Sequence, residues 1–355
     1  MKVVSLFSGA GGLDKGFEEA GMEIILANEF DKKIHSTFRR NFPDTILDTR
    51  SIVDIDAKEI PDCDGIIGGP PCQSWSEAGA LRGIDDERGQ LFFEYIRILR
   101  EKKPKFFLAE NVSGMLFRRH NEAIDNILKR FQNLGYHVRY CILNSHNYGV
   151  PQTRERVIFV GYRKDYGKYF DAPEIDPEQS TLKDAIWDLR KNVVPALDKN
   201  KTNPKVKFRN HEYMIGGFST IYMSRNRVRR WDQPSFTIQA GGRHAPCHPQ
   251  APTMELLTKD VRKFVSGKEH LYRRLSVREC ARVQTFPDDF IFDYDRVADG
   301  YKMIGNAVPV KFAHHLAKKI KSDLHKKRRN KKFSKMEATA QQIKDYDEKQ
   351  LRLQI

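Results

Sequence analysis

Short apolar runs alternate with helical patterns through the first half of the chain. Residues 65–67 (Gly-Ile-Ile) are apolar throughout, as expected for a parallel strand that is buried on both faces. The other predicted strands are residues 2–7, 24–27, 45–47, 106–109, 138–143 and 157–161, and the predicted helices between them include residues 31–41, 91–102 and 122–134. This alternation predicts an α/β fold with a doubly wound, mostly parallel sheet.

The alternating pattern ends at about residue 163. Residues 164–267 are rich in Pro, Asn, Lys and isolated aromatic residues and show no sustained period, which predicts a second, smaller, loop-rich domain. Helical patterns return within residues 268–321, at 275–284 and 310–321. Residues 322–355 are polar and include an almost wholly basic run, so we expect a flexible or weakly helical basic tail that attracts phosphates.

The composition favours a polyanionic partner. Lys and Arg number 62 against 47 Asp and Glu among 355 residues, a net charge of +15, although a merely basic soluble protein stays an open alternative. Five cysteines with no CxxC pair indicate neither a disulfide framework nor a metal site, and they suit a reducing compartment. The sequence has no 18-residue apolar run and no export leader, so we expect a cytoplasmic protein with no membrane contact.

The loop Gly68-Gly69-Pro70-Pro71-Cys72-Gln73 carries a candidate nucleophile. It follows the apolar run 65–67, so Cys72 is expected at the carboxyl end of a parallel strand, where open α/β sheets bind ligands. Pro70 and Pro71 stiffen the backbone and leave its carbonyls free for a ligand. The alternative is an ordinary buried cysteine. A core cysteine has no need of this rigid frame, which favours a reactive thiol.

A glycine-rich turn follows the first predicted strand. Ser8-Gly9-Ala10-Gly11-Gly12 lies between residues 2–7 and a helical pattern, and this arrangement is typical of nucleotide sites because the free N–H groups of the helix start favour an anion. Glu29 ends the next strand about 20 residues further on, where an acid can bind both ribose hydroxyls. Asp48 and Ser51 follow the third strand, where a side chain could contact a base.

Three more charged residues are candidates for chemistry at the same edge of the sheet. Glu110 ends an apolar strand and could hold or protonate a ring nitrogen while Cys72 attacks the ring, although helix capping is a common use of such an acid. Arg154 and Arg156 lie just before the predicted strand 157–161, and alternation places them on one face. Two guanidinium groups there could bind a phosphate or a ring carbonyl, or form ordinary surface salt bridges.

Arginines also gather in the loop-rich region. Arg225 and Arg227 alternate with polar residues, and Arg243 follows two glycines. Such arginines can read guanine in a major groove, each bidentate pair giving roughly 1–3 kcal/mol of discrimination. A basic face that only holds phosphates is the other interpretation.

Together these motifs resemble the DNA (cytosine-5) methyltransferases. The resemblance rests on residues 7–12, Glu29, residues 70–73, 110–112, 152–156, 278–284 and 305–309, which occur in the family's order and cover about residues 1–321. The sequences of residues 68–76 and 300–304 look most like those of the bacterial type II restriction-modification members that methylate within GGCC.

The resemblance implies a Rossmann-like domain that binds S-adenosylmethionine. Residues 1–163 would be the catalytic and cofactor-binding domain, 164–267 the target-recognition domain, and 268–321 a return to the first. The implied cofactor residues are Phe7, Ser8, Gly9, Ala10, Gly11, Gly12, Glu29, Ser51, Ile52, Pro71, Leu91, Asn306 and Ala307. Where the family has Gly-Asp-Ile, this chain has Arg50-Ser51-Ile52, which leaves Asp48 or a main-chain carbonyl to hold the adenine amino group.

The resemblance also implies the catalytic and DNA-binding residues. Cys72 would be the nucleophile, Glu110 would contact the cytosine ring nitrogen and amino group, and Arg154 and Arg156 would orient the flipped base. The implied DNA contacts are Gln73, Ser76, Arg225, Arg227 and Arg243.

The implied activity is methyl transfer to C5 of a flipped-out cytosine in duplex DNA. A bond from Cys72 to C6 would activate C5, and the product would protect host DNA from a cognate restriction endonuclease; we expect a monomer. A tRNA cytosine-5 methyltransferase and a non-catalytic DNA-binding protein stay open as alternatives. About a hundred residues separate Arg156 from the returning helix, and this long recognition region favours duplex DNA.

Overall fold

A seven-stranded sheet forms the centre of the protein. The structure, a computed structural model, describes residues 1–71, 87–117 and 121–325. The strands are β1 (Lys2–Leu6), β2 (Glu23–Asn28), β3 (Ile46–Asp48), β4 (Gly65–Gly68), β5 (Phe106–Val112), β6 (Tyr136–Asn144) and β7 (Glu155–Arg163), in the spatial order β3-β2-β1-β4-β5-β7-β6. Strands β1 to β5 pair in parallel, whereas β7 pairs antiparallel with both β5 and β6. The predicted doubly wound, mostly parallel sheet is confirmed.

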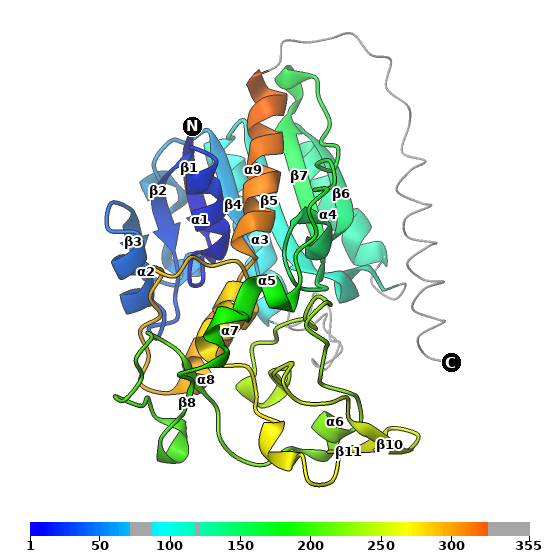
Figure 1. Ribbon diagram of the computed structural model, residues 1–355. Coiled ribbons are helices and arrows are strands. Elements are labelled where there is room, and N and C mark those ends of the chain that lie inside the picture. The colour runs from blue at the N-terminus through cyan, green and yellow to red at the C-terminus, as the bar shows by residue number, and fades with distance from the viewer. Residues whose placement is uncertain (72–86, 118–120, 326–355) are drawn as a thin grey trace.

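Helices cover both faces of this sheet, as Figure 1 shows. The longer ones are α1 (Gly12–Glu19), α2 (His35–Asn41), α3 (Glu87–Lys102), α4 (Asn121–Asn133), α7 (Val277–Val283), α8 (Val297–Asn306) and α9 (Val310–His325). Successive strand residues enter opposite cores: Ile66 packs with α3 and α4, and Ile67 packs with α1 and α9. The continuous apolar runs of the sequence thus reflect burial on both faces.

The last described helix returns to the first. Helix α9 lies along α1, and Gly16 permits the close approach, because a Cβ there would come within 2.4 Å of the Ala313 Cβ and 2.6 Å of the Val310 carbonyl oxygen. Figure 1 shows α9 beside α1 in front of the sheet. This packing carries the segment between α8 and α9 to the glycine turn that precedes α1.

Residues 164–267 contain only short elements. Besides short 3-10 helices, these are α5 (Leu182–Ile186), α6 (Thr220–Met223), the strand pair β8 (Val194–Pro195) and β9 (Glu212–Tyr213), and the pair β10 (Glu255–Thr258) and β11 (Val261–Lys263). Leu182 and Ile186 of α5 are buried in the cluster that contains α7 and α8, whereas Tyr222 and Met254 belong to a separate small core. In Figure 1 the part that contains α6, β10 and β11 lies beyond one edge of the sheet layer.

The structure differs from the sequence prediction at α2 and α8. The helix expected at residues 31–41 begins at His35, because residues 31–34 form a turn. Helix α8 was not predicted from the sequence. Among the described residues, none of the helices has the length and apolar character needed to span a membrane.

Candidate functional site

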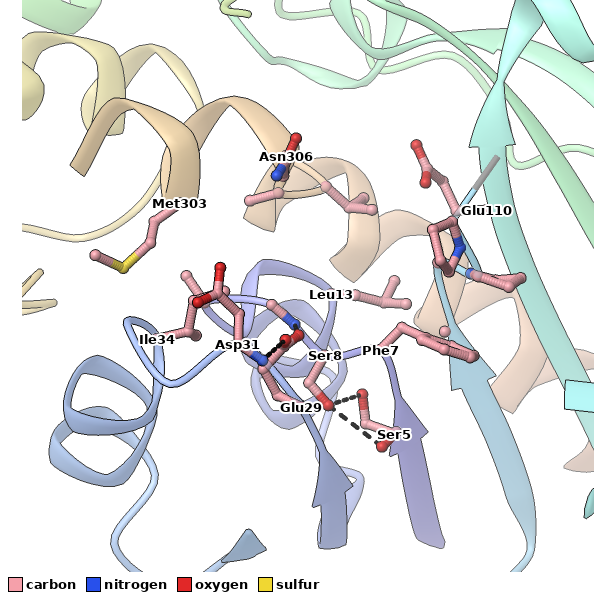
Figure 2. A pocket seen from close by; sticks show the side chains of 18 of the residues that line it. Ser5, Phe7, Ser8, Leu13, Glu29, Asp31, Ile34, Glu110, Met303 and Asn306 are labelled. Carbon is pink, nitrogen blue, oxygen red and sulfur yellow. Dashed lines mark hydrogen bonds between the residues drawn. The ribbon is translucent and has the colours of Figure 1, made fainter. Parts of the chain in front are cut away.

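A cavity of about 610 Å³ opens at the carboxyl ends of β1, β2, β4 and β5. Figure 2 shows Met303 and Asn306 of α8 lying across it from Glu29 and Asp31, with Glu110 of β5 at the far side. Carboxyl strand ends are where open α/β sheets bind ligands. The predicted cofactor residues among its lining are Phe7, Ser8, Gly9, Ala10, Glu29, Ser51, Ile52, Pro71, Leu91, Asn306 and Ala307.

The glycine turn between β1 and α1 divides into lining and packing residues. Gly9 lines the cavity, and its N–H donates to Glu29 Oε2 at 2.9 Å. Gly11 and Gly12 lie outside the cavity lining. A Cβ at Gly12 would come within 2.3 Å of the Val308 carbonyl oxygen, so this glycine permits the close approach of the segment after α8.

Glu29 directly follows β2 and is fixed by main-chain amides. Its two carboxylate oxygens accept the N–H groups of Gly9 at 2.9 Å and Asp31 at 2.7 Å. Burial raises the pKa of Glu29, and the two amide hydrogen bonds act in the opposite direction. Each carboxylate oxygen can accept more than one hydrogen bond, so Glu29 retains capacity for ligand hydroxyls.

In the turn after β3, the side chains that face the cavity are not all the ones that the sequence predicted. Ser51 and Ile52 line the cavity, but Asp48 does not. Arg50 donates to both oxygens of Asp48, the shortest contact being 2.7 Å, and this holds the pKa of the Asp48 carboxyl below its ordinary value. The Asp48 side chain is therefore paired with Arg50 and is not positioned to contact a base in the cavity.

Glu110 and Arg156 form an ion pair beside the predicted nucleophile loop. Glu110 lies within β5 and not after its end, and Arg156 Nε is 2.9 Å from Glu110 Oε1. Burial lowers the pKa of Arg156, and the Glu110 carboxylate opposes that shift. Asn111 Nδ2 donates to the Pro70 carbonyl at 3.0 Å, which attaches the Pro70–Pro71 backbone to β5.

The loop residues that follow lie outside the described part of the chain. These are Cys72, Gln73 and Ser76. Glu110 nevertheless lies close to the backbone that leads to them, because a Cβ on Gly69 would be 3.4 Å from Glu110 Oε2.

Arg154 has a different position from Arg156. Its side chain is only 2% exposed, and Nη1 donates to the Ile238 carbonyl at 3.0 Å. Nη2 donates to the carbonyls of Gly305 at 2.9 Å and Ala307 at 3.0 Å. The two arginines border one cavity, as alternation predicted, but the terminal nitrogens of Arg154 are already bonded to the chain, and Arg156 alone of the two pairs with Glu110.

The C-terminal side of the cavity contains residues that the sequence analysis missed. Lys302 of α8 donates to Asp31 Oδ2 at 2.8 Å and joins the two sides of the cavity. The other missed lining residues include Ser5, Leu13, Asp14, Phe30, Ile34 and Met303. Val297, Tyr301 and Ile304 are buried on one face of α8, so an apolar helical period was present in the sequence and could have identified this helix.

The three arginines predicted to read bases are not equivalent. Arg225 and Arg243 are exposed. Arg227 is half-buried, donates to the Tyr222 and Ile221 carbonyls at 2.9 and 3.0 Å, and stacks 4.8 Å above the Tyr222 ring. Its guanidinium is therefore largely occupied by contacts within the protein, whereas those of Arg225 and Arg243 are more accessible to a ligand.

Comparisons with known proteins give one consistent result. The family profile described as C-5 cytosine-specific DNA methylase matches residues 1–322. The type II methyltransferase M.FnuDI of Fusobacterium nucleatum is 57% identical over 336 residues, covering 94% of this chain and 97% of that protein. M.NgoPII of Neisseria gonorrhoeae is 56% identical over 331 residues, covering 92% and 97%. A solved structure of a Spodoptera frugiperda DNMT2 variant shares the fold, with a TM-score of 0.64, 19% identity, and coverage of 92% and 99%.

Proposed function

Because this chain belongs to the C-5 cytosine-specific DNA methylase family, we propose that it methylates C5 of a flipped-out cytosine in a specific short duplex sequence, through a covalent bond from Cys72 to C6. The chain is a type II DNA (cytosine-5) methyltransferase of the restriction-modification class. The proposed target is GGCC, and the proposed role is to protect host DNA from a cognate endonuclease. The sequences of residues 68–76 and 300–304, which resemble those of GGCC-methylating members of the family, support this target.

The cavity suits S-adenosylmethionine. Its volume of about 610 Å³ falls within the usual range for cofactor sites, roughly 300–1,000 Å³. Glu29 has acceptor capacity for ribose hydroxyls, Phe7 and Ile52 offer apolar surface, and Asn306 approaches from the opposite side. When bound, this cofactor supplies a methyl group on a positively charged sulfur. Ser8, Gly9, Ala10, Ser51, Pro71, Leu91 and Ala307 would complete the contacts.

The target base would lie between the cofactor and the ion pair of Glu110 with Arg156. Its ring must leave the DNA stack, because a nucleophile reaches C6 only from the face of the ring. The Cys72 thiolate forms a bond to C6, which makes C5 electron-rich, while Glu110 offsets charge at N3 and the amino group. After C5 has gained the methyl group, the C5 proton leaves to water and the C6–S bond breaks, which releases the thiolate.

The contact between Arg156 and Glu110 is the observation that carries this mechanism. It fixes the Glu110 carboxylate at 2.9 Å from a guanidinium, in the cavity and beside the backbone that leads to Cys72. A charge-assisted hydrogen bond of this kind holds the acid in one orientation before the base arrives. Arg154 would act as a positioning residue through Ile238, Gly305 and Ala307, and would not contact the base.

The mechanism is tested with Cys72→Ser. We expect no transfer of labelled methyl groups to duplex DNA, together with unchanged binding of S-adenosylmethionine by calorimetry. Cys63→Ser is the matched control, because Cys63 is partly buried outside the cavity and burial raises its pKa to about 12. Normal turnover by Cys72→Ser would refute the assignment.

The target sequence is tested separately on plasmid DNA. Plasmid methylated by the protein should resist restriction enzymes that cut within GGCC and remain sensitive to enzymes with other sites. Protection at a different sequence would overturn the GGCC assignment and leave the methyl-transfer mechanism intact.

Target recognition is proposed for residues 164–267, with Arg225 and Arg243 reading bases. Both side chains are exposed, and an exposed guanidinium can bind guanine O6 and N7 bidentately. The basic residues of 322–355 would add phosphate attraction that does not depend on sequence. The proposed active form is a monomer, and gel filtration that shows a dimer in the active fraction would contradict it.

A further inference from the structure

Asp14 is a buried acid that the proposed mechanism does not use. It lies in the first turn of α1, its side chain is fully buried, and it lines the cavity. Among the residues that the structure describes, neither of its carboxylate oxygens accepts a hydrogen bond of normal geometry, although the Ser5 hydroxyl and the main-chain N–H of Asp14 are near enough to lower its pKa. An unpaired buried carboxylate is strongly unfavourable, so this position calls for a compensating group from a ligand.

The surroundings of Asp14 do not neutralise it. Burial raises the pKa of Asp14 to about 7; the nearby Ser5 hydroxyl lowers it, and Glu18 and Glu29 raise it further. On α9, which packs along α1, His314 faces the backbone of Gly16. The principal charged neighbours of Asp14 are therefore acids, and a cation from outside the protein would be favourable here.

The start of α1 indicates which part of the cofactor lies beside Asp14. The helix begins after Gly11 with no side-chain cap, so its first N–H groups are available to an anion. In the amino acid part of S-adenosylmethionine, a carboxylate and an ammonium group share one carbon atom. A carboxylate held at the helix start would therefore bring the ammonium group close to the first turn, where Asp14 lies.

We propose that ionised Asp14 binds the α-ammonium group of the cofactor. This inference rests on the proposed function, because it assumes that the cavity holds S-adenosylmethionine. The two acids then bind different parts of the cofactor: Glu29 binds the ribose, and Asp14 binds the ammonium group of the amino acid part. Binding selects the ionised carboxylate, so the affinity depends on the fraction of the protein in which Asp14 has lost its proton.

The expected effect follows from that fraction. With the pKa of Asp14 at about 7, roughly a tenth of the protein is ionised at pH 6 and nine tenths at pH 8. The affinity of the wild-type protein, relative to Asp14→Asn, should therefore rise about tenfold from pH 6 to pH 8. A carboxylic acid that instead donated a proton to the cofactor carboxylate would give the opposite slope, and that result would overturn the proposal.

The experiment is calorimetric titration of the full-length protein at several pH values between 6 and 8. The ligand's own amine titrates near pH 8, but this effect cancels in the ratio of wild-type to variant affinity. Glu19→Gln is the matched control: it removes an exposed acid at the end of the same helix that lies outside the cavity lining and does not shift the pKa of Asp14, so it should keep the pH dependence. Circular dichroism shows whether Asp14→Asn, which preserves the side-chain shape, remains folded.

Two further ligands distinguish the groups that Asp14 could contact. S-adenosylhomocysteine keeps the ammonium group but has no charge on sulfur, so it should show the same loss on Asp14→Asn, about 10- to 100-fold at pH 8. Methylthioadenosine lacks the amino acid part and should bind both proteins equally. A loss confined to S-adenosylmethionine would place Asp14 at the sulfonium and overturn the ammonium assignment.

The outcomes also separate this inference from the proposed function. Wild-type protein that binds neither S-adenosylmethionine nor S-adenosylhomocysteine at any pH would refute both. Wild-type protein that binds them, with a ratio to Asp14→Asn that does not change with pH, would refute only the role of Asp14.

Discussion

Arg154→Lys should both destabilise the fold and disturb the proposed cofactor site. Arg154 is 2% exposed, and its two terminal nitrogens donate to the carbonyls of Ile238, Gly305 and Ala307. Gly305 lies in the last turn of α8, whereas Ile238 and Ala307 lie in irregular segments; Gly305 and Ala307 flank Asn306 at the edge of the cavity. Arg154 therefore connects the start of β7 to the segment that completes the lining of the cavity.

The magnitude follows from the three hydrogen bonds. A hydrogen bond to a charged group contributes about 1.5–3 kcal/mol, and a buried carbonyl left without its donor is also unfavourable. Lysine keeps the charge but presents a compact, strongly hydrated ammonium group in place of the planar fork, so it cannot replace all three contacts. We expect the free energy of unfolding to fall by about 3–5 kcal/mol. The affinity for S-adenosylmethionine should fall as well, because the position of Asn306 is no longer fixed.

Urea unfolding followed by circular dichroism measures the first effect, and calorimetry with S-adenosylmethionine measures the second. Arg163→Lys is the matched control, because Arg163 lies at the other end of β7 and pairs with Asp165 near the surface. Surface ion pairs contribute about 0–1 kcal/mol, so this control should change stability little. A loss below about 1 kcal/mol for Arg154→Lys would refute the reasoning from buried hydrogen bonds. Unchanged cofactor affinity in a destabilised variant would refute the link to Asn306.

Arg225→Ala and Arg243→Ala should each reduce discrimination between cognate and random duplexes by about 1–3 kcal/mol in competition binding, whereas equal losses on both would indicate phosphate contacts only. Gly12→Ala places a Cβ 2.3 Å from the Val308 carbonyl oxygen, and we expect urea unfolding to show a loss of about 1–3 kcal/mol; an unchanged midpoint would contradict the close packing. Burial raises the pKa of Asp14 from 3.8 to about 7, so between these values the native protein holds a proton that the unfolded chain has lost, and stability falls by up to ~4 kcal/mol as pH rises. Asp14→Asn should remove that decline in the ligand-free protein. If the wild-type and variant proteins gave identical curves of stability against pH, the raised pKa of Asp14 would be ruled out.

The sheet could be predicted from the sequence because its strands are buried on both faces and stand out as apolar runs. Helix α8 could not be recognised as easily, since Gly300 and Gly305 lie within it and glycine lowers helix propensity. The structure shows why both glycines are present. A Cβ on Gly300 would lie 2.6 Å from the Tyr294 ring, and one on Gly305 would lie 2.3 Å from the Gln239 backbone. Tertiary packing thus requires glycine at two positions where its low helix propensity makes the helix hard to predict from the sequence.

The part of the site that follows strand ends was likewise predictable. Glu29 directly follows β2, and the position of each strand end fixes which side chains face the ligand edge. The ion pair of Asp31 with Lys302 could not be predicted, because 271 positions separate the two residues and no local period relates them. The carbonyl partners of Arg154 belong to Ile238, Gly305 and Ala307, which lie 84, 151 and 153 positions further along the chain, so alternation could predict the face of this side chain but not its partners.

The proposed cofactor cavity depends on the packing of α9 against α1. The glycine turn of residues 8–12 comes from the beginning of the chain, and Asn306 and Ala307 come from a point about 300 residues later. Two glycines, which have no side chain of their own, let these segments approach: Gly16 lies against Ala313, and Gly12 lies against the Val308 carbonyl. Residues 1–163 therefore contain the proposed catalytic acid and the proposed ribose-binding acid but do not enclose the cavity alone. The return of the chain through α8 and α9 completes the site, and any change that separates α9 from α1 should weaken cofactor binding before it disturbs the sheet.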